Sequence, residues 1–562
     1  MVRVRTDCNA CGRNFSMTLR RSKRCDKFTA RLRIFVLQNF APLWRLVERI
    51  PFLSRKVNAL IINNACNAAK FRPHPMSTLC DYTTWQSMTD KAYLARAIPP
   101  GPPRSDLPPV ARAAQLFVPQ GEQRECPKST LLFPVFAQYL TDGFLRTDPH
   151  DRVKTTSNHD IDLSPLYGRT IAQTNALRLR SNQPGQKGHL RSQMIAGEEF
   201  SPELYRPDGT GLASAFIDES GKPVLDLPLG IDDGWVGGEG SRRHVFAVGG
   251  DRANSTALIA MVNTLFLREH NRLAGELERL NTEWDDERVF QTARNILIAI
   301  FIKIVVEEYI NHISSACFRL KADPSAAWAA KWNKSNWMTV EFSLLYRWHS
   351  LVPQKMLWDG KLIDSSEVLL DNSKLVEAGL SRAFQWAGQT HAAKLGLHNT
   401  AIFLENELTV ESRALKQNRD RRLRGYNAYR KSMSMKAVDG FDCMTGNAEW
   451  QEELQALYGS PDNVDFYVGL FAEDSGVNTP MPPLLGAMVA LDAFSQALNN
   501  PLLSSQVYNT DTFTDLGMAT IEGTACLWDV LSRNMGAKAA PGLSAEEVRM
   551  TRYDWKRRFG SF

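Results

Sequence analysis

The chain of 562 residues is poor in cysteine, and its few cysteines are spread thinly. The 9 cysteines are an odd number, unlike the dense, even sets that hold small secreted domains together. A disulfide scaffold is therefore excluded, and we expect an intracellular, reducing location. One Cys-x-x-Cys pair, Cys8 and Cys11, has no second pair at zinc-ribbon spacing, so ordinary thiols are favoured over a metal site.

The sequence also lacks an uncharged apolar run of about 18 residues, the length that a membrane-spanning helix requires. Its longest apolar stretch, residues 295–306, contains Lys303 and is followed by Glu307 and Glu308, which indicates a buried core helix. The N-terminus offers no apolar segment before a small-residue cleavage site. Classical secretion is therefore not expected, although an Arg-rich organelle transit peptide stays open.

An excess of one charge sign is found only at the N-terminus. The net charge is +6, yet the first 60 residues hold 14 Lys and Arg against 3 Asp and Glu. The rest of the chain is slightly acidic, which argues against general nucleic-acid binding. Hydrophobic residues make up 43% and charged residues 23%, the balance of a folded protein rather than a disordered one.

Three regions follow from the pattern along the chain. Residues 1–30 form a basic tail, residues 31–110 an amphipathic segment that ends in a Pro-rich connector, and residues 111–562 the main body. In the second region apolar residues recur at helical spacing between arginines, which predicts a basic amphipathic helix pair broken at Pro42 and Pro51. Such helices bind a membrane surface peripherally or dock on the body, and both interpretations stay open.

The main body is predicted to be mainly α. Few stretches alternate as strands do, and no internal repeat is present. Helical periodicity covers residues 132–146, 256–280, 286–317, 338–350, 378–393, 412–433 and 483–499.

Residues 341–353 are the most informative segment for chemistry. Tyr346 and His349 are three residues apart, so on a helix they would share one face, and Pro353 follows where that helix would end. Such a pair commonly serves packing alone. A neutral imidazole can nevertheless ligate iron, and a phenol beside an oxidised haem can become a radical.

At this point the sequence resembles the animal haem peroxidase and cyclooxygenase superfamily. The match to the prostaglandin endoperoxide synthase branch extends over most of residues 130–535, and the Leu-Tyr-Arg-Trp-His motif is equally similar to that of bacterial and fungal fatty-acid haem dioxygenases. The landmarks occur in the family's order: residues 136–138, 162–168, 267–272, 302–309, 318–324, 345–349 and 426–431.

The resemblance implies the helical haem peroxidase fold and assigns roles on the proximal side of the haem. His349 would be the ligand of the haem iron. Tyr346 would be oxidised to a radical that removes hydrogen from an unsaturated fatty acid. Asn427 matches the family position that supports the second ring nitrogen of the ligand, which fixes its orientation and basicity.

On the distal side the resemblance is incomplete. Gln138 matches the glutamine that faces bound peroxide, but Asp142 stands where the family has the proton-moving histidine. Arg252 stands at the spacing of the distal arginine, so we expect an Asp142/Arg252 pair to replace that histidine. The alternative is that Asp142 faces solvent and peroxide activity is weak. The loop residues His150 and His159 are further substitutes for the base, and His270 is expected in the core.

Two more departures bear on cofactors. Thr141 and Ser255 occupy the positions of the carboxylates that tie haem covalently in related peroxidases, which implies non-covalent haem b. Asp162 and Ser164 match positions that bind calcium in the family. Gly143 replaces an acidic ligand, so calcium binding should be weak or absent.

The preferred function is a haem-dependent dioxygenase. Its substrates would be an unsaturated fatty acid and O2, with peroxide as activator, and its product a hydroperoxide or an endoperoxide. One alternative is a haem peroxidase that oxidises small phenols, with Tyr346 a passive aromatic. Another is a degenerate haem protein without turnover, which the joint retention of four residues argues against: Gln138, Tyr346, His349 and Asn427.

Overall fold

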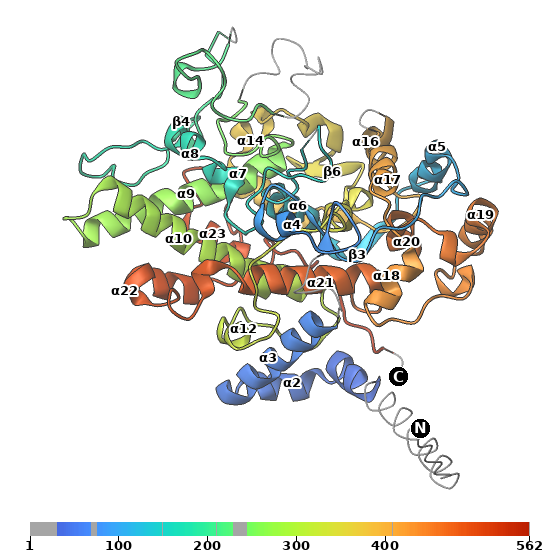
Figure 1. Cartoon of the computed structure of the whole chain (residues 1–562). Helices are drawn as coiled ribbons and strands as arrows, with labels where there is room; N and C mark the ends of the chain where they lie inside the picture. The colour runs from blue at the N-terminus through green and yellow to red at the C-terminus, as the bar shows by residue number, and fades with distance from the viewer. Residues whose placement is uncertain are drawn as a thin grey trace, which may run out of the picture.

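The computed structural model describes residues 31–68, 76–148, 150–208, 211–228, 244–406 and 409–560 (Figure 1). The basic tail, with Cys8 and Cys11, lies outside the described residues. The division of the chain near residue 110 stays a prediction. Residues 99–109, which include the Pro-rich connector, form neither helix nor strand.

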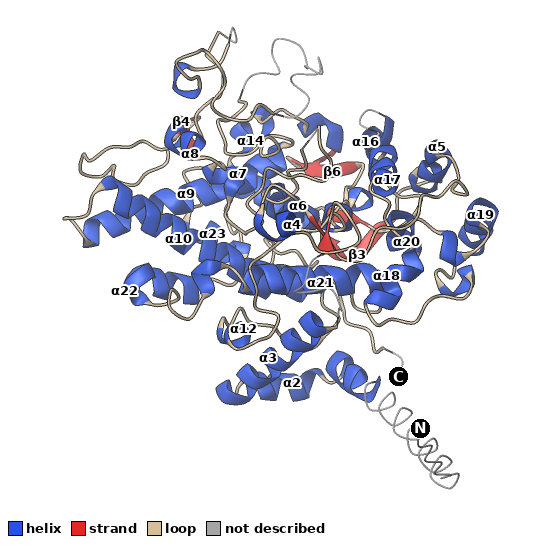
Figure 2. Ribbon diagram, in the orientation of Figure 1, coloured by secondary structure: helices blue, strands red, loops and turns tan. Residues whose placement is uncertain are grey.

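Helices make up most of the secondary structure (Figure 2), which confirms the mainly α prediction. The described strands form four two-stranded antiparallel sheets: β1 (Met76–Ser77) with β2 (Ala95–Arg96), β3 (Glu125–Thr130) with β8 (His391–Ala393), β4 (Gln193–Ile195) with β5 (Glu198–Phe200), and β6 (Lys355–Trp358) with β7 (Lys361–Asp364). The remaining helices of seven or more residues, beyond those discussed below, are α8 (Ile171–Leu177), α15 (Leu380–Gln389), α19 (Ala448–Tyr458) and α23 (Leu527–Arg533).

The core is built around two long helices, α9 (Ala257–Leu280) and α10 (Asp286–Ile304), which pack on each other, while α6 (Leu132–Asp142) packs on α9 and α22 (Thr510–Glu522) on α10. The Asp285 side chain caps α10 by accepting a hydrogen bond from the Arg288 amide. The helical stretch Asp286–Ile313 is long and apolar enough to cross a membrane, but 72% of its apolar window is buried. The expectation of a buried core helix at residues 295–306 is therefore confirmed.

The helical stretch that begins with α10 changes its winding after Ile304, where α10 ends. Residues Val305–Ile310 form a π turn, η4, which leads into the short helix α11 (Asn311–Ile313). A π turn holds one more residue than an α turn, so it rotates every side chain that follows. The buried Tyr309 lies in this turn.

The amphipathic segment forms a helix over residues 31–39, then α2 (Ala41–Glu48) and α3 (Pro51–Asn67). Pro42 and Pro51 lie in the first turns of α2 and α3, where a proline needs no amide donor, so the predicted break is confirmed. The helix α3 packs on α12 (Ser325–Trp328) and α21 (Pro483–Leu498), beside the body in Figure 1. Asn58 exchanges two hydrogen bonds of 3.0 Å with the Lys321 backbone. One face of the segment is thus docked.

The segment around Tyr346 differs from the predicted helix over residues 338–350. The helix α13 covers only Phe342–Leu345, and Tyr346 follows with φ −104° and ψ 18°. The Trp348 indole donates a 2.6 Å hydrogen bond to the Leu345 carbonyl, which in a continued helix would accept from the His349 amide. A 3₁₀ turn, η5 (His349–Leu351), comes next. Tyr346 and His349 therefore do not share a helix face.

Candidate active site

The imidazole of His349 is anchored by a carboxylate. Its Nδ1 donates to Glu411 Oε1 over 3.1 Å, from η5 to the first turn of α17 (Val410–Asp420). Glu411 is buried and also accepts hydrogen bonds from Thr400 Oγ1 at 2.8 Å and Tyr467 Oη at 2.6 Å. The His349 side chain keeps 19% of its surface exposed, and its Nε2 bonds to no described residue. One nitrogen is thus held and the other is available as a ligand.

This arrangement differs from the prediction for Asn427. In α18 (Tyr426–Ser432), Asn427 Nδ2 donates to the Val438 carbonyl at 3.0 Å and to Asp462 Oδ1 at 2.8 Å, and its Oδ1 accepts from the Val438 amide at 2.9 Å. These bonds secure the chain that follows α18 and leave no contact with His349. In the structure it is Glu411, not Asn427, that bonds to the second ring nitrogen of His349. No motif marked this residue, because the fold alone brings position 411 to position 349.

Tyr346 lies among aromatic rings and is 9% exposed. Its ring centroid is 4.5 Å from that of Phe342 and 5.1 Å from that of Trp348, on which it stacks. Trp348 in turn stacks on Phe133 of α6 at 5.5 Å. Burial and then the neighbouring Tyr346 phenol raise the pKa of Tyr309 well above its usual value. The Tyr346 ring therefore lies among aromatic side chains, and its phenol is close enough to Tyr309 to affect the pKa of that residue.

The helix α6 contains Gln138 and Asp142, the two helix residues predicted for the distal side. It packs near both of its ends against the segment that holds Tyr346. Phe133 near its start contacts Trp348, and Phe144 just past its end lies 5.6 Å from Phe342, centroid to centroid. Between them, Gln138 Nε2 donates to Ser255 Oγ over 2.8 Å. Asp142 is only 3% exposed, so the alternative that it faces solvent is wrong.

Asp142 is a buried carboxyl group with one unused oxygen. Its Oδ2 has no hydrogen-bond partner among the described residues. Its pKa is raised to about 7, above all by burial; the charge of Arg252 opposes this rise and that of Asp251 adds to it. Arg252 Nη1 donates to the Leu145 carbonyl, and no ion pair joins Arg252 to Asp142 within 4.0 Å in the ranges described. Asp142 and Arg252 thus influence each other by charge, without forming an ion pair.

The histidines proposed as substitutes are occupied or remote. His159 is fully buried, with Nε2 bonded to the Lys91 carbonyl at 2.6 Å and Nδ1 to the Met338 amide at 2.8 Å. His150 is exposed. His270 is a core residue as expected: it bonds Tyr167 Oη and the Gly188 carbonyl, and burial lowers its pKa to about 3.

The predicted calcium positions lie together but are satisfied by protein groups. Asp162 Oδ1 accepts from the Ser164 amide at 2.8 Å and Oδ2 from Asn158 Nδ2 at 2.6 Å. A Cβ atom on Gly143 would lie 3.2 Å from Ser164 Oγ and 3.6 Å from Asp162 Oδ1, so an acid there would face both. Within the described residues no group of three or more His, Cys, Asp or Glu side chains could hold a metal ion.

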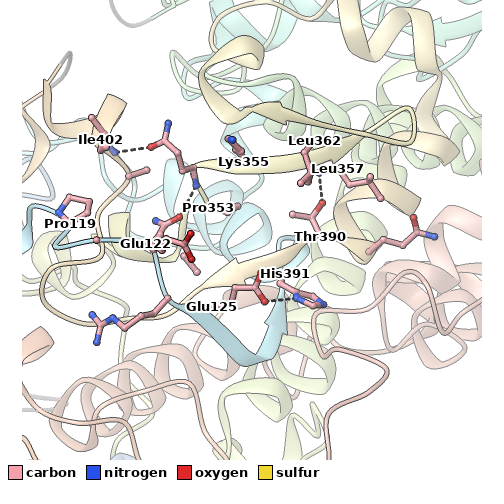
Figure 3. Close-up of a pocket in the computed structure, with 17 residues that line it drawn as sticks. Pro119, Glu122, Glu125, Pro353, Lys355, Leu357, Leu362, Thr390, His391 and Ile402 are labelled. Atoms are coloured by element: carbon pink, nitrogen blue, oxygen red, sulfur yellow. Dashed lines mark hydrogen bonds and ion pairs between the residues drawn. The ribbon is translucent and has the colours of Figure 1, made fainter. Parts of the chain in front are cut away.

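A pocket of about 590 Å³ opens beside the proximal segment (Figure 3). It is lined by residues of β6, β7 and β8, by Glu125 at the start of β3 and by the chain before it, and it includes Gln354 and His391. Gln123 on its wall donates to the Val352 carbonyl at 2.9 Å. None of the predicted catalytic or haem-binding residues lines this pocket.

Comparison with known sequences defines the class of the protein. The model of the animal haem peroxidase family matches residues 144–542, and the chain belongs to this family. Membership implies haem as cofactor and places the protein among the oxidoreductases. The resemblance inferred from the motifs is confirmed.

Individual relatives agree with this assignment. The chain is 27% identical to prostaglandin G/H synthase 2 of Bos taurus over 537 residues, which cover 92% of this chain and 83% of that protein. It is 28% identical to prostaglandin G/H synthase 1 of Rattus norvegicus over 524 residues, 91% of this chain and 81% of that one.

Two solved structures share the fold at low sequence identity. Oryza sativa fatty acid alpha-dioxygenase superposes with a TM-score of 0.66 at 16% identity and covers 89% of this chain and 94% of its own. Peroxidase A from Dictyostelium discoideum superposes with a TM-score of 0.64 at 18% identity, covering 85% and 99%. The predicted fold class is thereby confirmed.

The residues present fit a haem. His349 offers an imidazole nitrogen that bonds to no described residue, and Asp142 on α6 offers a buried carboxyl oxygen without a partner among the described residues. The buried Asp142 oxygen requires a partner that the described residues do not supply. The assignment of the two residues as iron ligand and distal acid–base group stays a prediction.

Replacing Glu411 should weaken haem binding. In Glu411→Gln the charge that orients His349 is lost, and we expect a 10- to 100-fold loss of haem affinity in a titration followed by the Soret band. Asn427→Ala is the matched comparison and should bind haem like the parent protein. The opposite ranking of the two variants would restore the sequence-based assignment to Asn427.

Asp142 should impose a pH dependence on the reaction of the haem-loaded protein with hydrogen peroxide. Only the carboxylate can accept the peroxide proton, so the stopped-flow rate should rise with pH and level off above about pH 7. Asp142→Asn should be on the order of 100-fold slower, without this rise. Equal rates in both proteins would remove Asp142 from the mechanism.

The pH dependence of the stability difference between Asp142→Asn and the parent protein provides a control. Because the pKa of Asp142 is about 7 when folded and about 3.9 when unfolded, its favourable contribution is complete below pH 4 and is lost as the pH rises to 7. The melting temperature of Asp142→Asn, relative to the parent, should therefore be higher at pH 8 than at pH 5.

Proposed function

We propose that the protein is a haem-dependent dioxygenase of unsaturated fatty acids, in which Tyr346 is the residue that removes hydrogen from the substrate. The observation that carries the proposal is the position of its phenol, buried among aromatic rings and three residues from the carboxylate-anchored His349. The fatty acid dioxygenase and prostaglandin synthase relatives support it.

The chemistry of Tyr346 forms a closed cycle. The tyrosyl radical takes a hydrogen atom from an allylic or bis-allylic carbon, which leaves a carbon radical on the acid and restores the phenol. Addition of O2 gives a peroxyl radical. That radical takes the hydrogen atom back from Tyr346, so the product is a hydroperoxide and the tyrosyl radical is regenerated. Aromatic surroundings that exclude water favour this cycle, because they limit side reactions of the radicals.

The residues around the cofactor have separate tasks. Non-covalent haem b, when bound, supplies the oxidising equivalent that converts Tyr346 to its radical. His349 would hold the iron, and Glu411 would fix the imidazole and increase its basicity. Gln138 is held toward Ser255, which has no carboxylate to form an ester link to haem, and the same is true of Thr141.

A phenol-oxidising peroxidase is the second candidate, and the packing of Tyr346 on Phe342 and Trp348, which suits a passive aromatic residue, favours it. A buried carboxyl whose pKa lies near neutrality suits proton transfer at peroxide, which both candidates need. They differ in whether Tyr346 takes part in substrate oxidation.

Oxygen consumption by the haem-reconstituted protein tests the proposal. With linoleate or arachidonate we expect uptake that a saturated acid does not elicit and that Tyr346→Phe abolishes, because phenylalanine has no phenolic hydrogen to give up. Tyr553→Phe, at an 82% exposed site, should retain full activity. Peroxide-driven oxidation of small phenols that survives in Tyr346→Phe, with no acid consuming oxygen, would support the peroxidase instead.

We also propose that the amphipathic segment is a peripheral membrane anchor, through which a lipid substrate would be collected. Large apolar side chains on α2, α3 and the turn between them are solvent-exposed: Leu43 45%, Leu46 58%, Ile50 46%, Phe52 68% and Leu60 60%. Basic residues lie among them, and this combination suits an anionic lipid surface. The docked face of α3 would hold the anchor against the body.

Vesicle co-sedimentation checks the anchor. The protein should bind vesicles that contain phosphatidylserine, and Leu46→Ser with Phe52→Ser should reduce the bound fraction at least severalfold because two inserting side chains are lost. Ile171→Ser, at an 80% exposed site in α8, serves as control and should bind normally. Unchanged binding of the double variant would exclude the segment as anchor.

A further inference from the structure

The pocket beside the proximal segment has no part in the proposed reaction (Figure 3). Its volume of about 590 Å³ falls in the range of sites that hold a small organic molecule. Residues of both β3–β8 and β6–β7 line it, together with the chain segments around Gln354 and Ile402. The fold therefore assembles this wall from parts of the chain that are far apart in sequence.

Two glutamines hold the wall together. Gln123 Nε2 donates to the Val352 carbonyl at 2.9 Å and to the Asn399 carbonyl at 2.8 Å. Its Oε1 accepts from the Gln354 amide at 2.7 Å, and Gln354 Oε1 in turn accepts from the Ile402 amide at 2.9 Å. These bonds tie three segments to one another, so the pocket keeps its shape without a ligand.

Glu125 and His391 form a polar pair on the wall that keeps a free hydrogen-bond acceptor. His391 Nδ1 donates to Glu125 Oε2 over 2.7 Å (Figure 3). A neutral imidazole with its proton on Nδ1 has an acceptor at Nε2. His391 Nε2 bonds to no residue in the part of the chain that the structure describes. The pair thus presents an acceptor to a ligand that carries a hydroxyl group.

Apolar side chains line the rest of the pocket. The larger ones are Leu357, Leu362 and Ile402, of which Leu362 and Ile402 are solvent-exposed. Apolar surface of this kind becomes more stable when a ligand covers it. The pocket therefore suits a molecule with an apolar body and one polar end.

The charged side chains of the wall, apart from His391, balance one another. They are two bases and two acids: Arg124, Lys355, Glu122 and Glu125. The Arg124 guanidinium packs over the Trp450 ring at 4.6 Å, and Glu125 is bonded to the imidazole. A wall without net charge does not select an ion, so an uncharged ligand is favoured.

The pocket also touches the segments that position His349. Pro353 lines it and directly follows the residue whose amide donates to the His349 carbonyl at 3.1 Å. Ala401 lines it too and directly follows Thr400, whose hydroxyl donates to Glu411 at 2.8 Å. A ligand that packs on Pro353 and Ala401 therefore bears on both supports of the imidazole.

We propose that the pocket binds a small uncharged aromatic alcohol, and that its binding is coupled to the position of His349. The hydroxyl group donates to His391 Nε2, and the ring covers Leu357 and Leu362. An aromatic hydroxyl is favoured over an aliphatic one because it is the stronger donor. Binding itself needs neither haem nor turnover, whereas the coupling to haem rests on the proposed function, in which His349 holds the iron.

The experiment compares 2-naphthol with 2-methoxynaphthalene, which has the same rings but no hydroxyl hydrogen. Each is titrated into the apoprotein by fluorescence, with no peroxide present. His391→Phe removes the acceptor and keeps a ring, while His391→Gln restores an acceptor. Leu362→Asp alters the apolar wall at an exposed site, and Met194→Asp, at a similarly exposed site on β4, is its control.

We expect His391→Phe to bind 2-naphthol about tenfold more weakly than the parent protein, the effect of one lost hydrogen bond, and His391→Gln to bind it nearly as well. The methyl ether should bind the parent and His391→Phe equally. Leu362→Asp should weaken both ligands, and Met194→Asp neither. No binding of 2-naphthol, or equal binding of 2-naphthol by the parent and His391→Phe, would overturn the proposal.

Haem titrations followed by the Soret band test the coupling. Saturating 2-naphthol should change the haem affinity of the parent by about fivefold or more, and haem should change the affinity for 2-naphthol by the same factor, because coupling is reciprocal. At the same concentration of 2-naphthol, His391→Phe should show a smaller change. An unchanged haem affinity in the parent would refute the coupling. Neither titration involves oxygen, so a failed dioxygenase assay would leave the result for the pocket intact.

Discussion

The buried carboxylate of Glu411 is the constraint on which the site depends. A charge removed from water must be met by hydrogen bonds, and Glu411 receives them from η5, from the chain before α16 (Ile402–Asn406), and from α20 (Phe466–Ala472). These segments are far apart in sequence. By meeting at one carboxylate they fix the imidazole of His349, and with it the turn that presents Tyr346.

Close packing of helices behind this contact keeps Tyr467 in place. Gly469 lies in the middle of α20, and a Cβ atom there would come within 2.3 Å of the Tyr426 ring on α18. The absence of a side chain allows the two helices to approach, so the Tyr467 hydroxyl reaches Glu411. The position of the His349 imidazole therefore depends on Gly469, through Tyr467 and Glu411. In a closely packed interior, a small displacement of one residue is passed on to its neighbours.

Local patterns were sufficient to predict the helical class, the core helix at residues 295–306 and the prolines that begin α2 and α3, because periodicity and proline geometry act within a few residues. Motifs likewise pointed to Tyr346, His349 and Gln138. They could not show that Trp348 ends the helix by taking the Leu345 carbonyl, nor that Glu411 rather than Asn427 meets His349. Both depend on side chains finding partners across the fold.

The π turn η4, which follows α10, restricts the number of residues that this stretch of helix can contain. Each residue of a helix advances the side-chain direction by about 100°. Tyr309 stacks near Phe133 at 5.6 Å and Trp348 at 6.3 Å only because residues 305–310 hold one residue more than an α turn. Loss of any single residue from this stretch would restore a regular helix and turn Tyr309 and His312 away from α6. Within this helix the number of residues is under stricter control than their identity.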